Sequence, residues 1–281
     1  MSWLLWAAAV GIMFYAAQFQ ERTGPTKEFK GSFSFVGEEI SYGLVRSGNT
    51  DAEAPVIVPD PGSGLTGQVF FKRYPTSDPF TPIPMESVAG DLQALLPTQP
   101  AAGKLEYYVV LESSEGTIRI PEEDTLILRY KDPVPLGILV PHVICMFLGL
   151  LLGVRTALGA VLDPMGLKRL AWTTLGLLTV GGMILGPIVQ KYAFGAFWTG
   201  WPFGYDLTDN KTLIMWVVWV AAALVLQFKP EAKRLGRGVV LVGALTMMVV
   251  YLIPHRLRGS ELDYSQVDAG VSAEEAVTTG N

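Results

Sequence analysis

Two histidines and one ring-rich segment are the residues of this chain best suited to bind a metal or a flat ligand. His142 and His255 are its only histidines, and between them residues 192–206 read YAFGAFWTGWPFGYD, with seven aromatic residues in fifteen. Neutral imidazoles ligate heme iron, and aromatic rings give a porphyrin an apolar surface. We therefore predict a heme site in which both histidines are metal ligands. The other expected contacts are Phe194, Phe197, Trp198, Trp201, Tyr205 and Asp206.

Five apolar runs must position these residues. Half of the 281 residues are hydrophobic and 17% are charged, which fits neither an ordinary soluble globule nor a disordered chain. Each run approaches the length of a bilayer crossing and contains no Asp, Glu, Lys or Arg. The sequence therefore predicts a polytopic helical membrane protein. The expected crossings are residues 3–19, 134–154, 170–189, 213–228 and 239–253.

Basic residues in the short loops indicate the orientation. Loop 155–169 carries three Lys or Arg residues and loop 229–237 carries four, so both loops are expected on the cytoplasmic side. The N-terminus would then be cytoplasmic in an inner membrane, with segment 20–131, the outer loop 190–211 and the C-terminus outside. The first run has no Lys or Arg before it. It is therefore expected to be a retained anchor, residues 1–20, rather than a cleaved signal peptide.

Segment 21–132, between the first two crossings, is predicted to be all β. Short alternating runs at residues 32–35, 69–71 and 105–111 are separated by Gly, Pro, Asn and Asp, and about seven to nine such strands make a sandwich. Residues 65–130 resemble an immunoglobulin-like or fibronectin-like domain, with proline turns at 97–100 and the tyrosine pair Tyr107-Tyr108 in the next strand. That resemblance implies a periplasmic sandwich domain and no particular chemistry.

The ring-rich outer loop resembles the tryptophan-rich loop of the heme-handling proteins of cytochrome c maturation. Those proteins carry W-G-x-x-W-x-W-D between histidines on neighbouring helices. Residues 194–198 fall on the first half of the pattern, although Phe194 replaces the leading Trp, and Trp201 with Asp206 matches the second half loosely. The resemblance implies heme binding or handover at the outer face of the membrane, with a cytochrome as partner.

A non-catalytic alternative explains many of the same features. Trp and Tyr collect at membrane interfaces without any ligand, and small residues four apart, as in Gly149/Gly153 and Gly182/Gly186, let helices pack closely. The chain could then be an accessory or scaffold subunit of a membrane complex that docks a partner through its sandwich. Transport is less attractive, because no carboxylate lies within a crossing. An enzyme is not indicated, since no nucleophile–base pair or paired carboxylates are apparent.

The remaining motifs favour structural roles. The glycines at 62–67 precede a strand, so they predict a turn rather than a dinucleotide loop. Asp209 is expected to cap the fourth crossing rather than to bind a cation with Asp206 and Asn210. The single cysteine, Cys145, excludes an intrachain disulfide, and the net charge of −5 argues against nucleic acid as a partner. The bundle is expected at 133–256, and the polar tail 257–281 is expected to be disordered.

Overall fold

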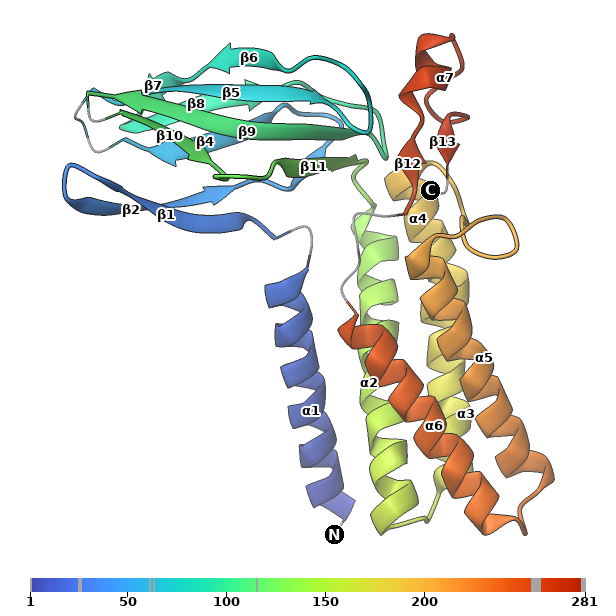
Figure 1. Ribbon diagram of the computed structural model, residues 1–281. Coiled ribbons are helices and arrows are strands. Elements are labelled where there is room, and N and C mark those ends of the chain that lie inside the picture. Colours follow the sequence, from blue (N-terminus) through green and yellow to red (C-terminus); the bar gives the residue numbers. More distant parts are fainter. Residues whose placement is uncertain are drawn as a thin grey trace.

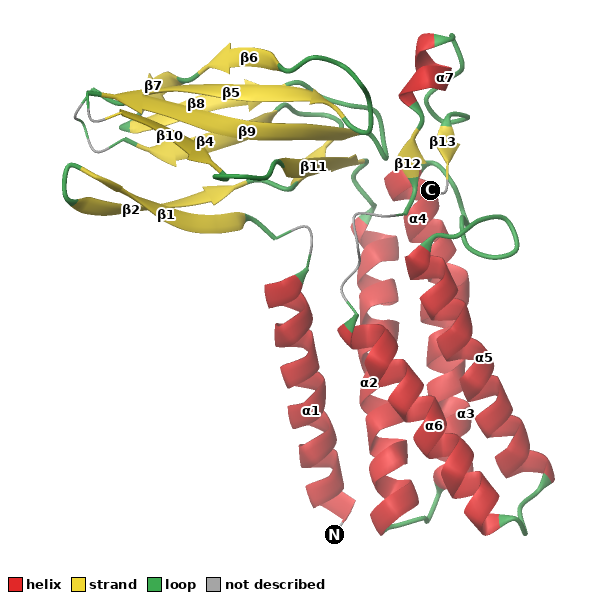
Figure 2. Cartoon of the chain, in the orientation of Figure 1, coloured by secondary structure: helices red, strands yellow, loops and turns green. Residues whose placement is uncertain are grey.

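The computed structural model describes residues 2–24, 27–60, 62, 64–114, 116–253 and 259–278. Upright helices form one half of the molecule, and β-strands lie across one end of them (Figure 1). The strands are continuous in sequence between the first helix and the second, and a short mixed segment follows the last long helix (Figure 2).

The β-domain consists of three sheets around one hydrophobic core. β5 and β9 are central to the largest sheet, whose order is β3-β11-β9-β5-β6 with β10 on β9; a second sheet has the order β4-β8-β7, and β1 pairs with β2. The strands are β1 (Phe29–Phe35), β2 (Glu38–Leu44), β3 (Ser47–Asn49), β4 (Ala54–Pro59), β5 (Thr66–Arg73), β6 (Thr81–Pro84), β7 (Glu86–Val88), β8 (Asp91–Leu96), β9 (Lys104–Ser113), β10 (Gly116–Ile120) and β11 (Leu126–Lys131).

Alternation of side chains produces the core. In β9, Tyr107, Val109 and Leu111 are fully buried while the residues between them are partly exposed, as expected for a strand with one face inward. All three sheets contribute to the same core cluster. The strands predicted at 32–35, 69–71 and 105–111 are confirmed, and they lie within β1, β5 and β9.

Five helices are long and apolar enough to cross a membrane, among the described residues. They match the five apolar runs of the sequence. The first, second, fourth and fifth are α1 (Ser2–Thr23), α2 (Leu136–Leu162), α5 (Leu207–Phe228) and α6 (Lys233–Leu252). The third is a continuous rod of α3 (Leu167–Leu178), a π-helical stretch η1 (Thr179–Leu185) and α4 (Gly186–Phe194).

Small residues allow the helices to approach closely. A Cβ atom on Gly153 would lie 2.1 Å from Met247 Cε, and one on Gly149 would lie 3.2 Å from a Leu178 methyl. Trp219 fills the centre of the bundle and is fully buried. The Gly149/Gly153 pair therefore serves packing within the chain, which was one of the two uses that the sequence allowed.

One loop is shorter than the charge pattern suggested. Residues 155–169 were expected to connect two crossings, but α2 continues to Leu162. Arg155 therefore lies within the helix, is only 4% exposed, and holds its guanidinium 5.5 Å from the ring of Trp6 in α1. This contact joins α1 and α2 in their halves away from the sheets, whereas Figure 1 shows the other end of α1 leaning away from the other helices.

The C-terminal segment is ordered where the structure describes it, contrary to the expected disorder of 257–281. Residues 259–278 form β12 (Glu261–Leu262), α7 (Tyr264–Asp268) and β13 (Val277–Thr278). Leu262, Tyr264 and Ala276 are buried in a small core of their own. The sequence prediction failed because the segment is too polar to show a periodic pattern, and its order depends on specific contacts with the β-domain described below.

Candidate functional site

A cavity of about 810 Å³ lies between α1, α2, α4 and α5, directly below β11. We call it the outer cleft. Its lower walls are mainly apolar, and its upper rim, at the sheet end, is polar and charged. The apolar lining includes Phe14, Met146, Phe147, Val189 and Phe194, and the polar lining includes Arg129, Lys131, His142, Gln190, Asp206 and Asp209.

His142 is held in one orientation in the wall of this cleft. It lies in the second turn of α2, and its Nδ1 is 2.9 Å from the carbonyl oxygen of Gly181 in η1. The same carbonyl accepts the Gly186 N–H, five residues on, as π-helical bonding requires. Because a carbonyl oxygen only accepts, Nδ1 carries a proton, and in the neutral ring Nε2 then keeps a lone pair.

The π-helical stretch makes this contact possible. Pro187, the second residue of α4, has no N–H to donate, so the regular bonding ladder is interrupted just before it. Gly181 has no side chain to hold η1 away from α2, since a Cβ there would lie 2.8 Å from Cys145 Cβ. The sequence indicated that Pro187 would loosen the ladder near the outer end of this helix, and the π-helix lies at that position.

A smaller, deeper cavity of about 220 Å³ adjoins the cleft at His142. Leu150, Leu178, Met215 and Met247 form its apolar floor. Lys211 lines it as well, only 7% exposed, and donates to the carbonyl oxygen of Ile253 (3.1 Å). His142 therefore lies between an apolar recess in the bundle core and the wider cleft beneath the β-domain.

Two cationic side chains reach the rim of the cleft from the end of β11. Arg129 lies over the ring of Phe194, with 4.0 Å between the guanidinium carbon and the ring centroid, and its Nη2 donates to the Ser260 carbonyl (2.8 Å). Its Nε is buried without a hydrogen-bond partner. Burial lowers the pKa of Arg129, while the nearby Asp206 and Glu261 carboxylates act in the opposite direction. Lys131, two residues later, lines the same rim.

A cluster of buried polar groups holds the aromatic loop, residues 195–206, to the start of α5. Asp206 is the N-cap of α5, with Oδ1 accepting from Thr208 N–H (2.8 Å) and Oδ2 accepting from Ser260 N–H (3.0 Å). Asp209 Oδ2 accepts from Thr199 N–H (2.6 Å). The capping residue is therefore Asp206, and the expectation that Asp209 caps this helix is wrong.

Gly200 is the residue of this loop where close packing leaves no room for a side chain. A Cβ on Gly200 would lie 2.5 Å from Asp209 Cβ. Asn210 Oδ1 accepts from Trp201 N–H (2.7 Å), and Trp198 Nε1 donates to the Trp201 carbonyl (3.0 Å). Asp206, Asp209 and Asn210, considered in the sequence as a cation site, thus bind backbone N–H groups of their own loop and of the C-terminal segment.

The structure brings together only some of the predicted heme contacts. His142, Phe194 and Asp206 line the outer cleft. The lining that the described residues form does not include Phe197, Trp198, Trp201 or Tyr205. Phe197 is 58% exposed, Trp201 is 65% exposed and Tyr205 is 80% exposed. His255 lies outside the described residues.

A metal site made of protein groups alone is not found in the described part of the chain. No three His, Cys, Asp or Glu residues there are grouped so that they could hold an ion. A heme carries other ligands of its iron within its own ring, so a single imidazole would be enough to anchor it here. The single imidazole with a free Nε2 and the apolar walls fit a heme group of this kind.

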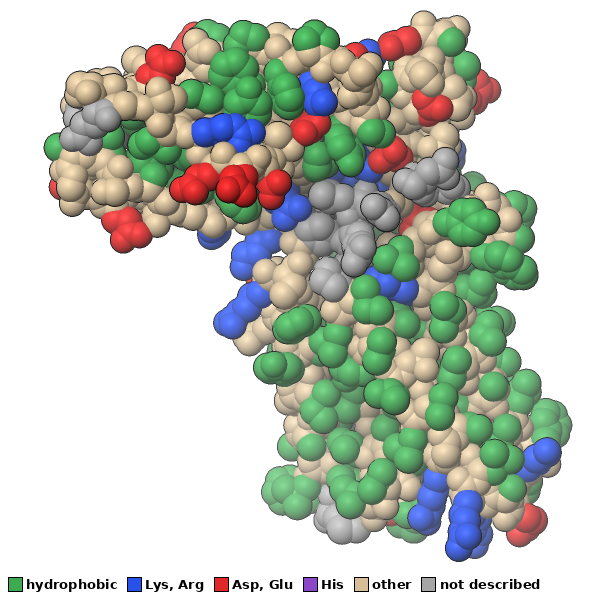
Figure 3. All heavy atoms as spheres, in the orientation of Figure 1, with side chains coloured by type: hydrophobic (Ala, Val, Ile, Leu, Met, Phe, Trp, Pro, Cys, Tyr) green, Lys and Arg blue, Asp and Glu red, His purple; other side chains and the backbone are tan. Residues whose placement is uncertain are grey.

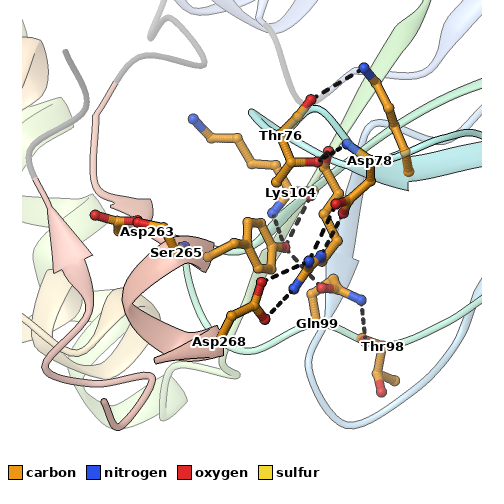
Figure 4. Close-up of polar contacts among 11 residues, drawn as sticks. Thr76, Asp78, Thr98, Gln99, Lys104, Asp263, Ser265 and Asp268 are labelled. Atoms are coloured by element: carbon orange, nitrogen blue, oxygen red, sulfur yellow. Dashed lines mark hydrogen bonds and ion pairs between the residues drawn. The ribbon is translucent and has the colours of Figure 1, made fainter. Parts of the chain in front are cut away.

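The C-terminal segment is clamped to the β-domain by charged pairs (Figure 4). Arg73 makes two hydrogen bonds to the Asp268 carboxylate, at 2.7 and 2.9 Å, and two to Asp78, at 2.7 and 3.4 Å. These contacts lower the pKa of both carboxyl groups. Lys104, almost fully buried, pairs with Glu261. Burial lowers the pKa of Lys104, and Glu261 opposes that effect.

Tyr264 completes this clamp. The Lys104 N–H donates to its hydroxyl (3.1 Å), and the hydroxyl donates to Gln99 Oε1 (2.8 Å). Burial raises the pKa of Tyr264 to about 12, so the hydroxyl keeps its proton at neutral pH. A Cβ on Gly103 would lie 3.0 Å from this hydroxyl, so the glycine leaves room for the ring to dock.

Sequence reasoning missed the residues that reach the cleft from other parts of the chain. Arg129 and Lys131 lie at the end of a strand, where their only signal was a position just before the second apolar run. Gln190, whose Nε2 donates to Thr199 Oγ1 (2.7 Å), gave no signal beyond being polar next to an apolar run.

No protein-family model matches the chain, and no curated protein matches it either.

Proposed function

We propose that this protein binds heme in the outer cleft and holds it for, or hands it over to, a partner cytochrome in cytochrome assembly or electron transfer. His142 Nε2 is the axial ligand in this proposal. The observation that carries it is the hydrogen bond from His142 Nδ1 to Gly181, because it fixes the tautomer and ring orientation that a metal-ligating imidazole needs.

The dimensions and chemistry of the cleft support a porphyrin. Its volume of about 810 Å³ lies within the range of small-molecule sites, which is about 300–1,000 Å³. Phe14, Phe147 and Phe194 offer flat apolar contacts. Arg129 and Lys131 line the rim, and in this proposal they would pair with the two propionate groups of a heme.

Three carboxylates line the cleft, those of Glu21, Asp206 and Asp209, and solvent around the exposed Glu21 screens its charge. Asp206 and Asp209 are 5% exposed and accept hydrogen bonds from the backbone N–H groups of Thr208, Ser260 and Thr199, which spread their charge. Bound heme would supply redox chemistry at its iron. The protein would orient the heme ring, shield it from water and bind its propionate groups.

The membrane placement belongs to the same proposal. The five long apolar helices would cross an inner membrane, with the β-domain, of immunoglobulin-like type, on the outer side. Figure 3 shows Lys and Arg side chains gathered at the end of the bundle away from the sheets, as the positive-inside rule requires of a cytoplasmic end. The outer cleft would then open at the outer leaflet.

The proposal is tested by hemin titration of the full chain in lipid nanodiscs. We expect a saturable Soret band for the wild-type protein and a loss of at least about tenfold in affinity for His142→Ala, because the iron loses its protein ligand. Added imidazole should restore the band in His142→Ala by entering the space left by the side chain. That rescue distinguishes ligation from a folding defect.

A charge-matched pair of variants tests the rim. Arg129→Gln should weaken hemin binding, whereas Arg119→Gln, on a strand that does not reach the cleft, should leave it unchanged. Absence of a saturable Soret band in the wild-type protein, or equal binding by wild type and His142→Ala, contradicts the proposal.

An accessory subunit is the second candidate. The C-terminal segment ties the β-domain to the bundle through Ser260, which bonds both Arg129 and Asp206, and this would suit a domain held in place for docking. A colourless protein that copurifies with one stable partner would favour this function over heme binding.

A further inference from the structure

Outside α1, the two most exposed aromatic side chains of the described residues, Tyr205 and Phe203, belong to the aromatic loop, and two more rings of the loop are also largely exposed. Trp201, Phe203 and Tyr205 are 65%, 79% and 80% exposed, and Phe197 is 58% exposed. None of the four lines the outer cleft. The proposed heme site therefore leaves them without a function, although rings of this size are costly to hold in water.

The loop is braced so that its rings stay on the outside. Gly200 O accepts from both Phe203 N–H and Gly204 N–H, each at 2.9 Å. Asn210 Oδ1 binds Trp201 N–H, and Asp209 binds Thr199 N–H. Because these four N–H groups bond within the protein, they can leave water without losing a hydrogen bond.

The surroundings of the loop indicate what covers it. Residues 192–205 include no Asp, Glu, Lys or Arg. The loop projects sideways from the bundle at the outer ends of α4 and α5 (Figure 1), and the exposed apolar side chains Ile214 and Val217 continue the surface along α5. Figure 3 shows hydrophobic side chains covering the helices up to the end nearest the sheets.

Given a bundle that crosses the membrane, as proposed above, we infer that the aromatic loop lies in the interfacial region of the outer leaflet. Trp201, Phe203 and Tyr205 would contact lipid at the level of the head groups and upper acyl chains. Aromatic residues favour this region because the ring is apolar while the indole N–H or phenol group remains hydrated. The loop would thus set the depth of the bundle and of the neighbouring outer cleft.

The test measures lipid contact at single positions in nanodiscs. A polarity-sensitive fluorophore is attached at Phe203→Cys in a Cys145→Ser background, and lipids brominated high or low on the acyl chain are used as quenchers. Val217→Cys, on the membrane-facing side of α5, and Ser272→Cys, in the exposed C-terminal segment, are the matched controls. We expect position 203 to be quenched more by shallow than by deep bromines, position 217 more by deep ones, and position 272 by neither.

A second measurement needs no label. Brominated lipid should quench the intrinsic tryptophan fluorescence of the wild-type protein more than that of Trp201→Phe. Equal quenching of the two proteins, or a label at 203 that behaves like the one at 272, overturns the inference. If position 217 also escapes quenching, the membrane placement fails instead, and hemin titration reports on the cleft separately.

Discussion

Replacement of Glu261 by glutamine should release the C-terminal segment from the β-domain. Lys104 is 1% exposed, and Glu261 is the acidic side chain that pairs with it. Glu261→Gln leaves the buried ammonium group without its counter-charge. Removing one partner of a fully buried pair costs about 3–5 kcal/mol. Since the Glu261 side chain is 18% exposed, a cost of about 2–4 kcal/mol is expected here.

That cost appears as local opening rather than global unfolding, because residues 259–278 have a small core of their own. Two kcal/mol corresponds to about a 30-fold increase in the undocked population. Hydrogen exchange with mass spectrometry measures it in peptides that contain Leu262, whose N–H donates to the Ala102 carbonyl. We expect about 30-fold faster exchange in these peptides for Glu261→Gln and no change for Glu274→Gln, which removes the same charge from an exposed position of the segment.

The pH dependence gives the prediction a second signature. Burial lowers the pKa of Lys104 in the docked state, and the loss of Glu261 lowers it further. The docked state then binds fewer protons than the undocked state, so docking of the variant strengthens as pH rises. Equal exchange in wild type, Glu261→Gln and Glu274→Gln would refute the idea that this ion pair holds the segment in place.

Three further outcomes follow from the same contacts. Gly200→Ala should lower thermal stability in detergent by about 1–3 kcal/mol, because its Cβ would lie 2.5 Å from Asp209 Cβ. Gly176→Ala is the control: the space around Gly176 is open, so this change should be neutral or stabilising by up to about 1 kcal/mol. Asp206→Ala should also destabilise, by about 1–2 kcal/mol, through the lost α5 cap, as measured by the same melting experiment. Arg73 lowers the pKa of Asp268 below its usual value of 3.8, so the protection that this pair gives is present above about pH 3.8 and is lost as pH falls through the lowered pKa. Hydrogen exchange of the segment between about pH 2 and 5 should show this loss, and Asp268→Asn should remove that pH dependence.

Much of the architecture could be predicted from the sequence because it depends on local patterns. Apolar runs without charge identified the five long helices, and alternation identified strands such as β9. The extent of α2 could not be found this way. Its last turns carry Arg155, a charge that ordinarily marks a loop, and the helix tolerates it because the side chain is packed against Trp6.

The candidate site could be predicted from the sequence only in part, because contacts between distant segments leave no periodic pattern in the sequence. His142 could be selected as a polar ring in an apolar run, but its partner is a backbone carbonyl 39 residues away, made available by a π-helix. The rings of the aromatic loop were assigned to the heme site by their position between the two histidines and by the resemblance to a tryptophan-rich loop, neither of which shows where the rings point. Their direction depends on hydrogen bonds that the Thr199 and Trp201 N–H groups donate to Asp209 and Asn210, which no spacing rule reveals.

The central claim, that the ligand occupies the outer cleft, is tested most directly by blocking the cleft from α1. Ala17 lines the cleft, whereas Tyr15, two residues earlier and 71% exposed, does not. A bulky thiol reagent is attached at Ala17→Cys or Tyr15→Cys in a Cys145→Ser background, and hemin is then titrated. We predict that the modified Ala17→Cys protein loses the Soret band while the modified Tyr15→Cys protein keeps it. Full binding by both modified proteins would contradict the account.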